Sequence, residues 1–442
     1  MKQSVQKPLS KQAEHKPRTD TDNIQSDFAP ELEAVTPQNI HYLQRTIGNQ
    51  ATLKLVQRQQ NPVHQRTNKS TIQRVETGLR DSGTSSGVVN IVHAFANDAA
   101  NADKHPRELL PIIMNAINAE LTKIEVPPTR IEENGAGGAN GTFSFRTWVI
   151  NLNSERKFRG KTKISELSKG EIASTVRTLY HESRHCEQWF RVARLLAGQH
   201  VARQQAASGM EALMDMIESA MNPALKVLKD IAEIATDINK RTKIPMNISM
   251  IAATKPLEPD SGQASEEANE WLQSIYGSNR TYRNMMLGSL KRAVKPLTTP
   301  TRELVNLVKL KEKASTDHDK EQTQLEIDNL IMNINALLEH VYAVRDSTLQ
   351  AEFDRLSALG SPSAVETTML THITNINGFI DQIKAISLDA STAQSMKTLV
   401  GQLAGERYQA YHDLPEEDDA HETGDTAQDQ YRSATVPAPA GP

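Results

Sequence analysis

Apolar residues recur every three or four positions along most of the chain between residues 85 and 410, which is the spacing of one face of an α-helix. The first two such runs are SSGVVNIVHAFANDAANA and PRELLPIIMNAINAELTKI. A polar turn and Pro106 separate them, and a proline can open a helix but disrupts its interior. The pattern therefore predicts two helices at the start of the folded part of the chain.

Alternating apolar and polar positions replace this spacing in GTFSFRTWVINLN, which carries aromatic and β-branched side chains. Such a run is typical of a strand, and we expect a short one over Thr142–Leu152. The preceding VPPTRIEE is joined to it by the glycine-rich ENGAGGANG, which predicts a flexible connection. A small amount of sheet is thus expected ahead of a long helix.

The helical spacing resumes in SELSKGEIASTVRTLYHESRHCEQWFRVARLLAG. Ser168 is of a type that caps helix N-termini and Gly198 of a type that ends helices, so we expect a helix of about seven turns between them. Its apolar positions are Ile172, Val176, Leu179, Trp189, Val192 and Leu196. A polar line on the same helix consists of Thr178, His181, His185 and Gln188. Polar side chains on a core-packed helix need partners.

Residues 200–410 are predicted to be helical almost throughout. Two apolar seams with spacings of three and four residues run through Ile327, Leu330, Ile334, Leu337, Val341 and Val344, and through Val365, Met369, Ile373, Ile376, Ile380 and Ile383. The turn Gly360-Ser361-Pro362 between the seams favours an antiparallel hairpin of long helices. The region is either an insertion that serves a functional site or a packed bundle that only adds stability.

The N-terminal segment has a different composition. Residues 1–82 are rich in glutamine, lysine, arginine, threonine and serine and poor in large apolar side chains, so they cannot bury enough surface to offset their ordering entropy. We expect disorder there and in the tail over residues 433–442. An apolar island at residues 41–58 interrupts the first segment.

Overall charge and cysteine content exclude several classes of protein. The chain has 50 Lys and Arg against 54 Asp and Glu, and its net charge of −4 gives no reason to expect a nucleic-acid partner. We find neither a general secretion signal nor the apolar run of about 20 residues that a membrane span needs. The single cysteine, Cys186, excludes an internal disulfide framework, and we expect it to be an inert buried thiol.

The stretch LYHESRHCEQWF contains an HExxH motif. Residues four apart share a helix face, so His181 and His185 can direct ring nitrogens at one zinc ion about 2.0–2.1 Å away. Glu182 lies about 100° round the helix axis from His181, where its carboxylate can reach a water held by the ion. Such a carboxylate takes a proton from the water during peptide hydrolysis.

A catalytic zinc site needs a third protein ligand. The extended HExxHxxGxxH pattern is absent, because Gln188 and Arg191 stand where its glycine and last histidine would be. Carboxylates occur on two later helical stretches, SEEANEW with Glu266, Glu267 and Glu270, and YHDLPEEDDAHETG with Glu416 and Glu417. Glu417 is favoured because a proline opens its helix and the small Ala420 follows one turn later, which allows close helix packing.

Two motifs carry a resemblance to a known family. The HExxHxxQ form over His181–Gln188 is followed late in the chain by Y-x-x-x-P-x-E-x-[DE]-A, represented by Tyr411, Pro415, Glu417, Asp419 and Ala420. Together they resemble the glutamate-zincin (gluzincin) metallopeptidase-like domains found among cargo and toxins of bacterial extracellular contractile injection systems. The island LQRTIGNQA, Leu43–Ala51, is similar to a short motif that commonly stands upstream of those domains.

The resemblance implies Glu417 as third zinc ligand, with Glu267 in reserve because a long span separates Glu417 from the histidines. It also allows Asp419 to orient a ligand and Tyr411 to act as a catalytic oxyanion donor, although each could equally be a capping or packing residue.

The implied fold is α+β and predominantly helical. A zincin-like domain with a short β-sheet is expected over residues 83–199 and a large all-helical insertion over 200–407. A return segment over 408–432 then carries the third ligand.

The implied function is a zinc-dependent metallopeptidase, a toxin or effector that hydrolyses peptide bonds of a protein in a target cell. It would be made in the cytoplasm, loaded into a contractile injection system through contacts with that system's components, and exported to the outside or into the target cell. One alternative is a non-catalytic cargo or interaction protein with a structural or vestigial zinc site and a helical bundle that binds a partner. Another is a peptidase that cleaves only its own chain or injection-system components.

Overall fold

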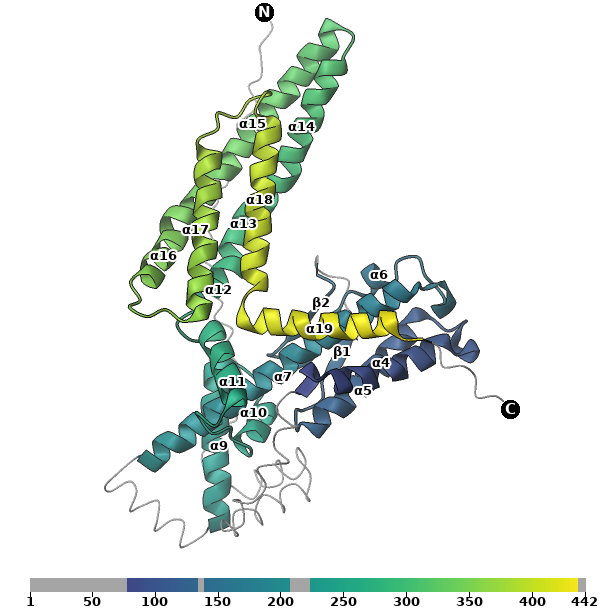
Figure 1. The fold of residues 1–442 in the computed structure, drawn as a ribbon, viewed down its shortest axis with the longest axis vertical. Helices are drawn as coiled ribbons and strands as arrows, with labels where there is room; N and C mark the ends of the chain where they lie inside the picture. The colour runs from purple at the N-terminus through teal and green to yellow at the C-terminus, as the bar shows by residue number, and fades with distance from the viewer. Residues whose placement is uncertain (1–77, 134–138, 207–222, 436–442) are drawn as a thin grey trace, which may run out of the picture.

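A computed structural model of the protein describes residues 78–133, 139–206 and 223–435 (Figure 1). These residues are mostly helical and include a sheet of three short strands, which confirms the predicted predominance of helix over sheet. The expectations for residues 1–77, for the motif at Leu43–Ala51 and for the last residues of the tail lie outside the described residues. Among the described helices, none combines the length and apolar composition that crossing a membrane requires.

Helix α7, Lys169–Ala206, is the long helix that carries the HExxH motif. Ser168 and Glu171 form reciprocal side-chain to backbone hydrogen bonds at its start, so the predicted N-terminal cap is confirmed. The two helices predicted before it are also present, as α4, Ser82–Asn97, and α5, Leu109–Lys123. Both pack with α7 into one apolar core.

Helix α7 does not end at Gly198, so the predicted stop is wrong. A Cβ atom at Gly198 would lie 1.9 Å from the carbonyl oxygen of Leu257, and Leu257 in turn donates its backbone N–H to the carbonyl oxygen of Arg194. Gly198 therefore serves close approach of a second backbone and not a change of chain direction. Glycine identity alone does not distinguish these two uses.

The sheet consists of β1, Arg130–Glu133, β2, Gly141–Ser144, and β3, Val149–Leu152. Its order is β1-β3-β2, with β1 parallel and β2 antiparallel to the central β3. The single strand predicted over Thr142–Leu152 is wrong, because a tight turn divides it into β2 and β3. Trp148 in this turn has a φ of 59°. Strand β2 is left at an edge of the sheet, on the side of α7.

Two separate apolar cores divide the helices that follow α7. The first core includes α9, Pro223–Thr242, α10, Met246–Ala253, and α11, Gln263–Ile275. The second core extends from Tyr282 to Leu414 and belongs to an elongated bundle (Figure 1). Its helices are α12, Arg280–Asn284, α13, Leu290–Val294, α14, Thr298–Lys313, α15, Asp317–Val344, α16, Gln350–Ser357, α17, Ala364–Lys384, and α18, Ala393–His412. The helical span predicted after α7 thus packs partly with α7 and partly by itself.

Both predicted seams face the core of the bundle. The fully buried members are Ile327, Ile334, Val341, Met369, Ile373, Ile376, Ile380 and Ile383. The hairpin partners differ from the prediction, because α15 pairs chiefly with α14, and α17 with α18. The turn at 360–362 joins the short α16 to α17. Apolar periodicity identifies a buried face but not the helix that covers it.

The chain enters the bundle after α11 and leaves it after α18, so the two ends of the bundle lie close together. Arg407 near the end of α18 donates a hydrogen bond from Nη1 to the carbonyl oxygen of Met286 at 3.2 Å, which joins the last helix of the bundle to its beginning. The chain then enters α19, Pro415–Ser433, which packs along α7 (Figure 1). The first residues of α19 therefore come back to the helix that carries the HExxH motif.

Replacing Gly198 by alanine should destabilise the fold. The new methyl group would meet backbone atoms, which cannot rotate away, and overpacking of this kind costs about 1–3 kcal/mol of unfolding free energy. Chemical denaturation with circular dichroism measures the change. Gly401 in α18 is the matched control, because a Cβ there meets nothing within 4 Å. Gly401→Ala should leave stability unchanged or raise it by about 0.5–1 kcal/mol, and equal destabilisation by both changes would contradict the packing argument.

Candidate metal centre and active site

Helices α7 and α19 bring His181, His185 and Glu417 together. His181 Nε2 lies 3.2 Å from His185 Nε2. Glu417 Oε2 lies 3.5 Å from His185 Nε2 and 3.9 Å from His181 Nε2. Ligands about 2.0–2.1 Å from a tetrahedral zinc ion are separated by roughly 3.3–3.5 Å, so these three atoms fit one such ion. Two overlapping groups of residues, His181–Glu182–His185 and His181–Glu417–His421, each have potential ligand atoms that lie within 4.8 Å of one another.

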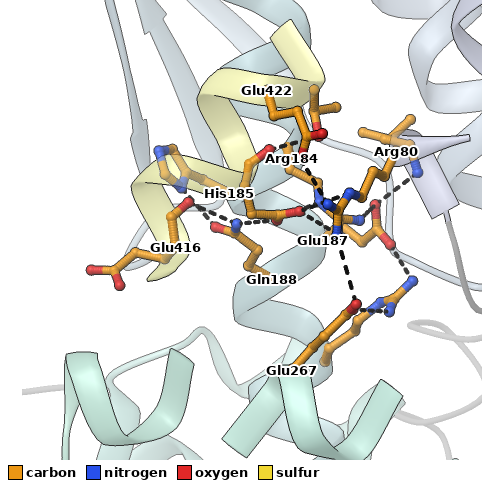
Figure 2. A network of polar contacts seen from close by, with 12 residues as sticks. Arg80, Arg184, His185, Glu187, Gln188, Glu267, Glu416 and Glu422 are labelled. Atoms are coloured by element: carbon orange, nitrogen blue, oxygen red, sulfur yellow. Dashed lines mark hydrogen bonds and ion pairs between the residues drawn. The ribbon is translucent and has the colours of Figure 1, made fainter. Parts of the chain in front are cut away.

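Gln188 fixes the orientation of the His185 ring (Figure 2). Its amide nitrogen donates to the carbonyl oxygen of Glu416 at 2.8 Å and to Asp419 Oδ2 at 2.6 Å. Both amide hydrogens are thereby used, so Gln188 Oε1, 2.8 Å from His185 Nδ1, acts as an acceptor. His185 carries its hydrogen on Nδ1, which leaves Nε2 free to hold a metal ion. The polar line predicted on this helix thus has its partners.

Glu417 is buried and accepts a hydrogen bond of 2.5 Å from the hydroxyl of Tyr411 at Oε2. Burial alone would raise the pKa of Glu417, but His185 and Tyr411 together lower it to about 2. Burial likewise opposes charge on His185, yet Glu417 raises the pKa of that ring to about 9. Without a cation the pair therefore holds a proton on His185, which a bound cation would displace.

The structure gives Tyr411 a specific contact. Its hydroxyl donates to the carboxylate oxygen of Glu417 that faces the two histidines. A hydroxyl in this position would orient Glu417 if that carboxylate binds a metal ion. The role of oxyanion donor, expected for Tyr411 from the resemblance, would require the hydroxyl to leave this carboxylate.

Glu182 lies beside the histidines on α7 and is only 7% exposed. Its Oε2 accepts the backbone N–H of Phe143 in β2 at 2.7 Å. Burial raises the pKa of Glu182 to about 7, which suits a group that must accept and then release a proton near neutral pH. The edge strand thus holds one oxygen of the carboxylate and leaves the other available.

Gly141 allows β2 to approach α7 this closely. A Cβ atom at this position would lie 2.7 Å from Thr178 Cγ2 and 3.3 Å from Glu182 Cγ. Gly424 in α19 has a similar role, since its Cβ would lie 3.0 Å from the carbonyl oxygen of Arg177 and 3.1 Å from His181 Cβ. Sequence reasoning identified the small Ala420 but missed Gly424 four residues later, although small residues four apart on one helix face indicate close packing.

An ionic network fixes α19 on α7 (Figure 2). Arg184 is fully buried and binds Asp419 through two hydrogen bonds, Nε to Oδ2 at 2.7 Å and Nη2 to Oδ1 at 3.0 Å. It also pairs with Glu187 at 2.7 Å, and Glu187 pairs with Arg191 at 2.6 Å. The backbone N–H of Leu79 donates to Glu187 as well. Arg184, which lies between the two histidines of the motif, thus serves helix docking.

Asp419 connects this network to the candidate ligands. It accepts hydrogen bonds from Arg184 and from Gln188, and Gln188 orients His185. Burial would raise the pKa of Asp419, but Arg184 lowers it, so the carboxylate is ionised at neutral pH. An orienting role was expected for Asp419. In the structure Asp419 contacts Gln188, and Gln188 contacts the ring of His185, so Asp419 does not touch the ring itself.

Glu267, the reserve ligand, lies on α11 among arginines. Its carboxylate is 3.8 Å from Arg80 Nη1 and 3.7 Å from Arg191 Nη1. It belongs to neither set of potential ligand atoms. Cys186 is buried, with its sulfur 3.9 Å from the carbonyl oxygen of Pro127, and burial raises the pKa of its thiol. The geometry thus favours Glu417 as ligand and an inert Cys186.

His421 was not singled out from the sequence. It follows Glu417 by one helical turn, and its ring centroid lies 4.5 Å from that of His181. Burial, together with the neighbouring His412, lowers the pKa of His421 to about 4. The spacing of four residues from Glu417 was the available signal, because it places both side chains on one face of α19.

Comparisons with family models, with curated proteins and with solved structures found no match to this chain.

Changing Glu417 to alanine should abolish tight zinc binding, because it removes one of three ligands. Changing Glu267 to alanine should leave zinc binding intact. Metal analysis of the purified proteins, followed by competition titration with a chromophoric chelator, measures both. One zinc ion per chain is expected in the unaltered protein and in Glu267→Ala. Loss of zinc from Glu267→Ala with retention in Glu417→Ala would move the third ligand to α11.

Changing Tyr411 to phenylalanine should weaken zinc binding by about tenfold to a hundredfold, because the ligand carboxylate loses its hydrogen-bond donor. The same chelator competition provides the measurement. Tyr408→Phe is the matched control, since Tyr408 lies on the same helix and is 49% exposed. Unchanged zinc affinity in Tyr411→Phe would show that the hydroxyl does not orient the ligand.

Proposed function

We propose that this chain is a zinc-dependent peptidase of the gluzincin type. His181, His185 and Glu417 would hold the ion, and Glu182 would be the general base. The observation that supports this most is that Glu417, far along the chain from the HExxH motif, lies 3.5 Å from His185 and 3.9 Å from His181. A carboxylate at this distance completes a donor set of two imidazoles and one carboxylate, which is typical of catalytic zinc.

A zinc ion in this position would supply a Lewis acid that makes a water molecule acidic enough to react at neutral pH. Glu182 would accept a proton from the attacking water as the new O–C bond forms at the peptide carbonyl carbon. The same carboxyl group would then deliver the proton to the amide nitrogen as the C–N bond breaks. Its pKa of about 7 suits both transfers.

Strand β2 supports a peptide substrate in two respects. It is an edge strand of the sheet, and an extended peptide can add to such an edge through backbone hydrogen bonds. It also positions Glu182 through Phe143, so a peptide bound along β2 would lie next to the general base. The choice of substrate sequence would then depend on side chains near β2. Phe145 is one of them, and its ring stacks on Trp189 with centroids 4.1 Å apart.

Delivery through a contractile injection system remains a prediction from the resemblance, because the motif at Leu43–Ala51 lies outside the described residues. Deleting this motif tests it directly, since packaging into the apparatus should fail while zinc content is kept. Protein substrates in a target cell and contacts with injection-system components belong to the same proposal. We propose in addition that the bundle, which joins α19 directly, influences access to the site.

Changing Glu182 to glutamine should abolish most hydrolysis and retain zinc. The amide keeps the size of the side chain but cannot accept a proton, so turnover should fall by about 10²–10⁴-fold. Cleavage of a random peptide library, followed by mass spectrometry, measures activity whatever the substrate sequence. Glu155→Gln, on an exposed position of the short helix α6, Ser154–Lys157, is the control and should keep full activity.

Two results would contradict this mechanism. Unchanged turnover in Glu182→Gln would remove the general base from the proposal. A protein that holds one zinc ion per chain and cleaves neither the library nor its own chain would favour the alternative of a structural zinc site in a non-catalytic cargo protein.

A further inference from the structure

We propose that His421 is a catalytic residue of this site, and that its Nε2–H donates a hydrogen bond to the substrate carbonyl oxygen as that oxygen gains negative charge. The inference rests on the proposed peptidase function and names a residue that the HExxH and E-x-D-A motifs do not include. Three observations support it: the position of the His421 ring beside His181, the contact of its Nδ1 with Arg177, and the burial of its Nε2 without a hydrogen-bond partner among the described residues.

The ring of His421 borders the space into which the candidate ligands point. One of its potential ligand atoms lies within 4.8 Å of those of His181 and Glu417. Its ring centroid is 4.5 Å from that of His181, and on its other side it stacks on His412 with centroids 4.2 Å apart and planes 12° apart. The imidazole is thus held next to the place where a scissile peptide would meet a bound ion.

The contact at Nδ1 determines which nitrogen carries hydrogen. Arg177 Nη2 lies 3.5 Å from His421 Nδ1, and the Arg177 guanidinium is itself paired with Asp425. A guanidinium has only donors, so Nδ1 must be the acceptor in this contact. The hydrogen of the neutral ring therefore lies on Nε2. A protonated ring would carry a hydrogen on Nε2 as well, so the donor does not depend on the charge of the ring.

His421 Nε2 is buried and has no hydrogen-bond partner among the described residues. A buried donor without an acceptor costs free energy, and such groups commonly have a functional explanation. An oxygen of the substrate would be that acceptor. Hydrogen bonds aimed at an oxygen that gains charge are worth more in the transition state than in the bound substrate, which is how they raise the rate.

Two other donors near the ligands are already used. The hydroxyl of Tyr411 donates to Glu417, and the backbone N–H of Phe143 donates to Glu182. The role of oxyanion donor expected for Tyr411 is thus better filled by His421.

A different role for His421, as a fourth metal ligand, is less compatible with these contacts. Ligation through Nε2 would require the ring hydrogen to lie on Nδ1, where it would face the donors of Arg177. A fourth protein ligand would also occupy the position that a catalytic zinc ion keeps for water. The geometry therefore favours a donor over a ligand.

The test compares His421→Phe and His421→Gln with the unaltered protein. Phenylalanine keeps a ring that can stack on His412 but has no donor, whereas glutamine keeps an N–H donor. We expect kcat to fall by about 10²–10³-fold in His421→Phe, with KM nearly unchanged, and to recover in part in His421→Gln. His318→Phe, at an exposed position of α15, is the control and should keep full activity.

Two further measurements separate a donor from a ligand. Zinc affinity should stay within about threefold in both His421 variants, well below the change of about tenfold or more expected when a ligand or its orienting partner is lost. The visible spectrum of the cobalt-substituted protein should not change. Weakened zinc binding or a changed cobalt spectrum would overturn the inference and make His421 a ligand.

Activity results distinguish this inference from the proposed function. Full kcat in His421→Phe, in an unaltered protein that cleaves peptides in a manner dependent on Glu182, would overturn the role of His421 alone. An unaltered protein that binds zinc and cleaves no peptide would overturn the peptidase proposal and this inference with it.

Discussion

The buried ion pair between Arg184 and Asp419 is the interaction on which the candidate site depends. It joins α7 to α19 through two hydrogen bonds, with Arg184 fully buried and Asp419 nearly so. Removing one partner of such a pair leaves an uncompensated charge, at a cost of about 3–5 kcal/mol. Because Glu417 is two residues before Asp419 on α19, the pair also sets the position of the third candidate ligand. The contact that docks α19 on α7 therefore also places Glu417 beside the two histidines.

The same network links the chemistry to more distant parts of the chain. Glu187 accepts a hydrogen bond from the backbone N–H of Leu79, and Arg191 lies near Glu267 of α11. Gln188 contacts both Asp419 and the ring of His185. Glu187, Gln188 and Arg191 all belong to α7 and lie within two turns of the histidines. A short stretch of helix thus orients a candidate ligand on one side and anchors neighbouring elements on the other.

Much of the site could be predicted because it depends on local spacing. The pair His181 and His185, the candidate base Glu182 and the capped start of α7 follow from helical periodicity, which acts over a few residues. Glu417 needed the resemblance in addition, because no local rule joins residues so far apart in sequence. Gly198 and the turn between β2 and β3 were misread, since their conformations depend on Leu257 and on backbone angles at Trp148. His421 was missed although its spacing from Glu417 is a local signal, whereas the contact of Arg184 with Asp419 forms only when α19 packs on α7.

The path of the chain has a consequence for how the protein is made. The histidine pair is synthesised early, but Glu417 follows only after the whole bundle, so the donor set cannot close on a nascent chain that ends within α9–α18. During translation the chain would carry His181, Glu182 and His185 before Glu417 is made. The bundle, whose last helix returns the chain beside Met286, must therefore be made before Glu417 can join the two histidines.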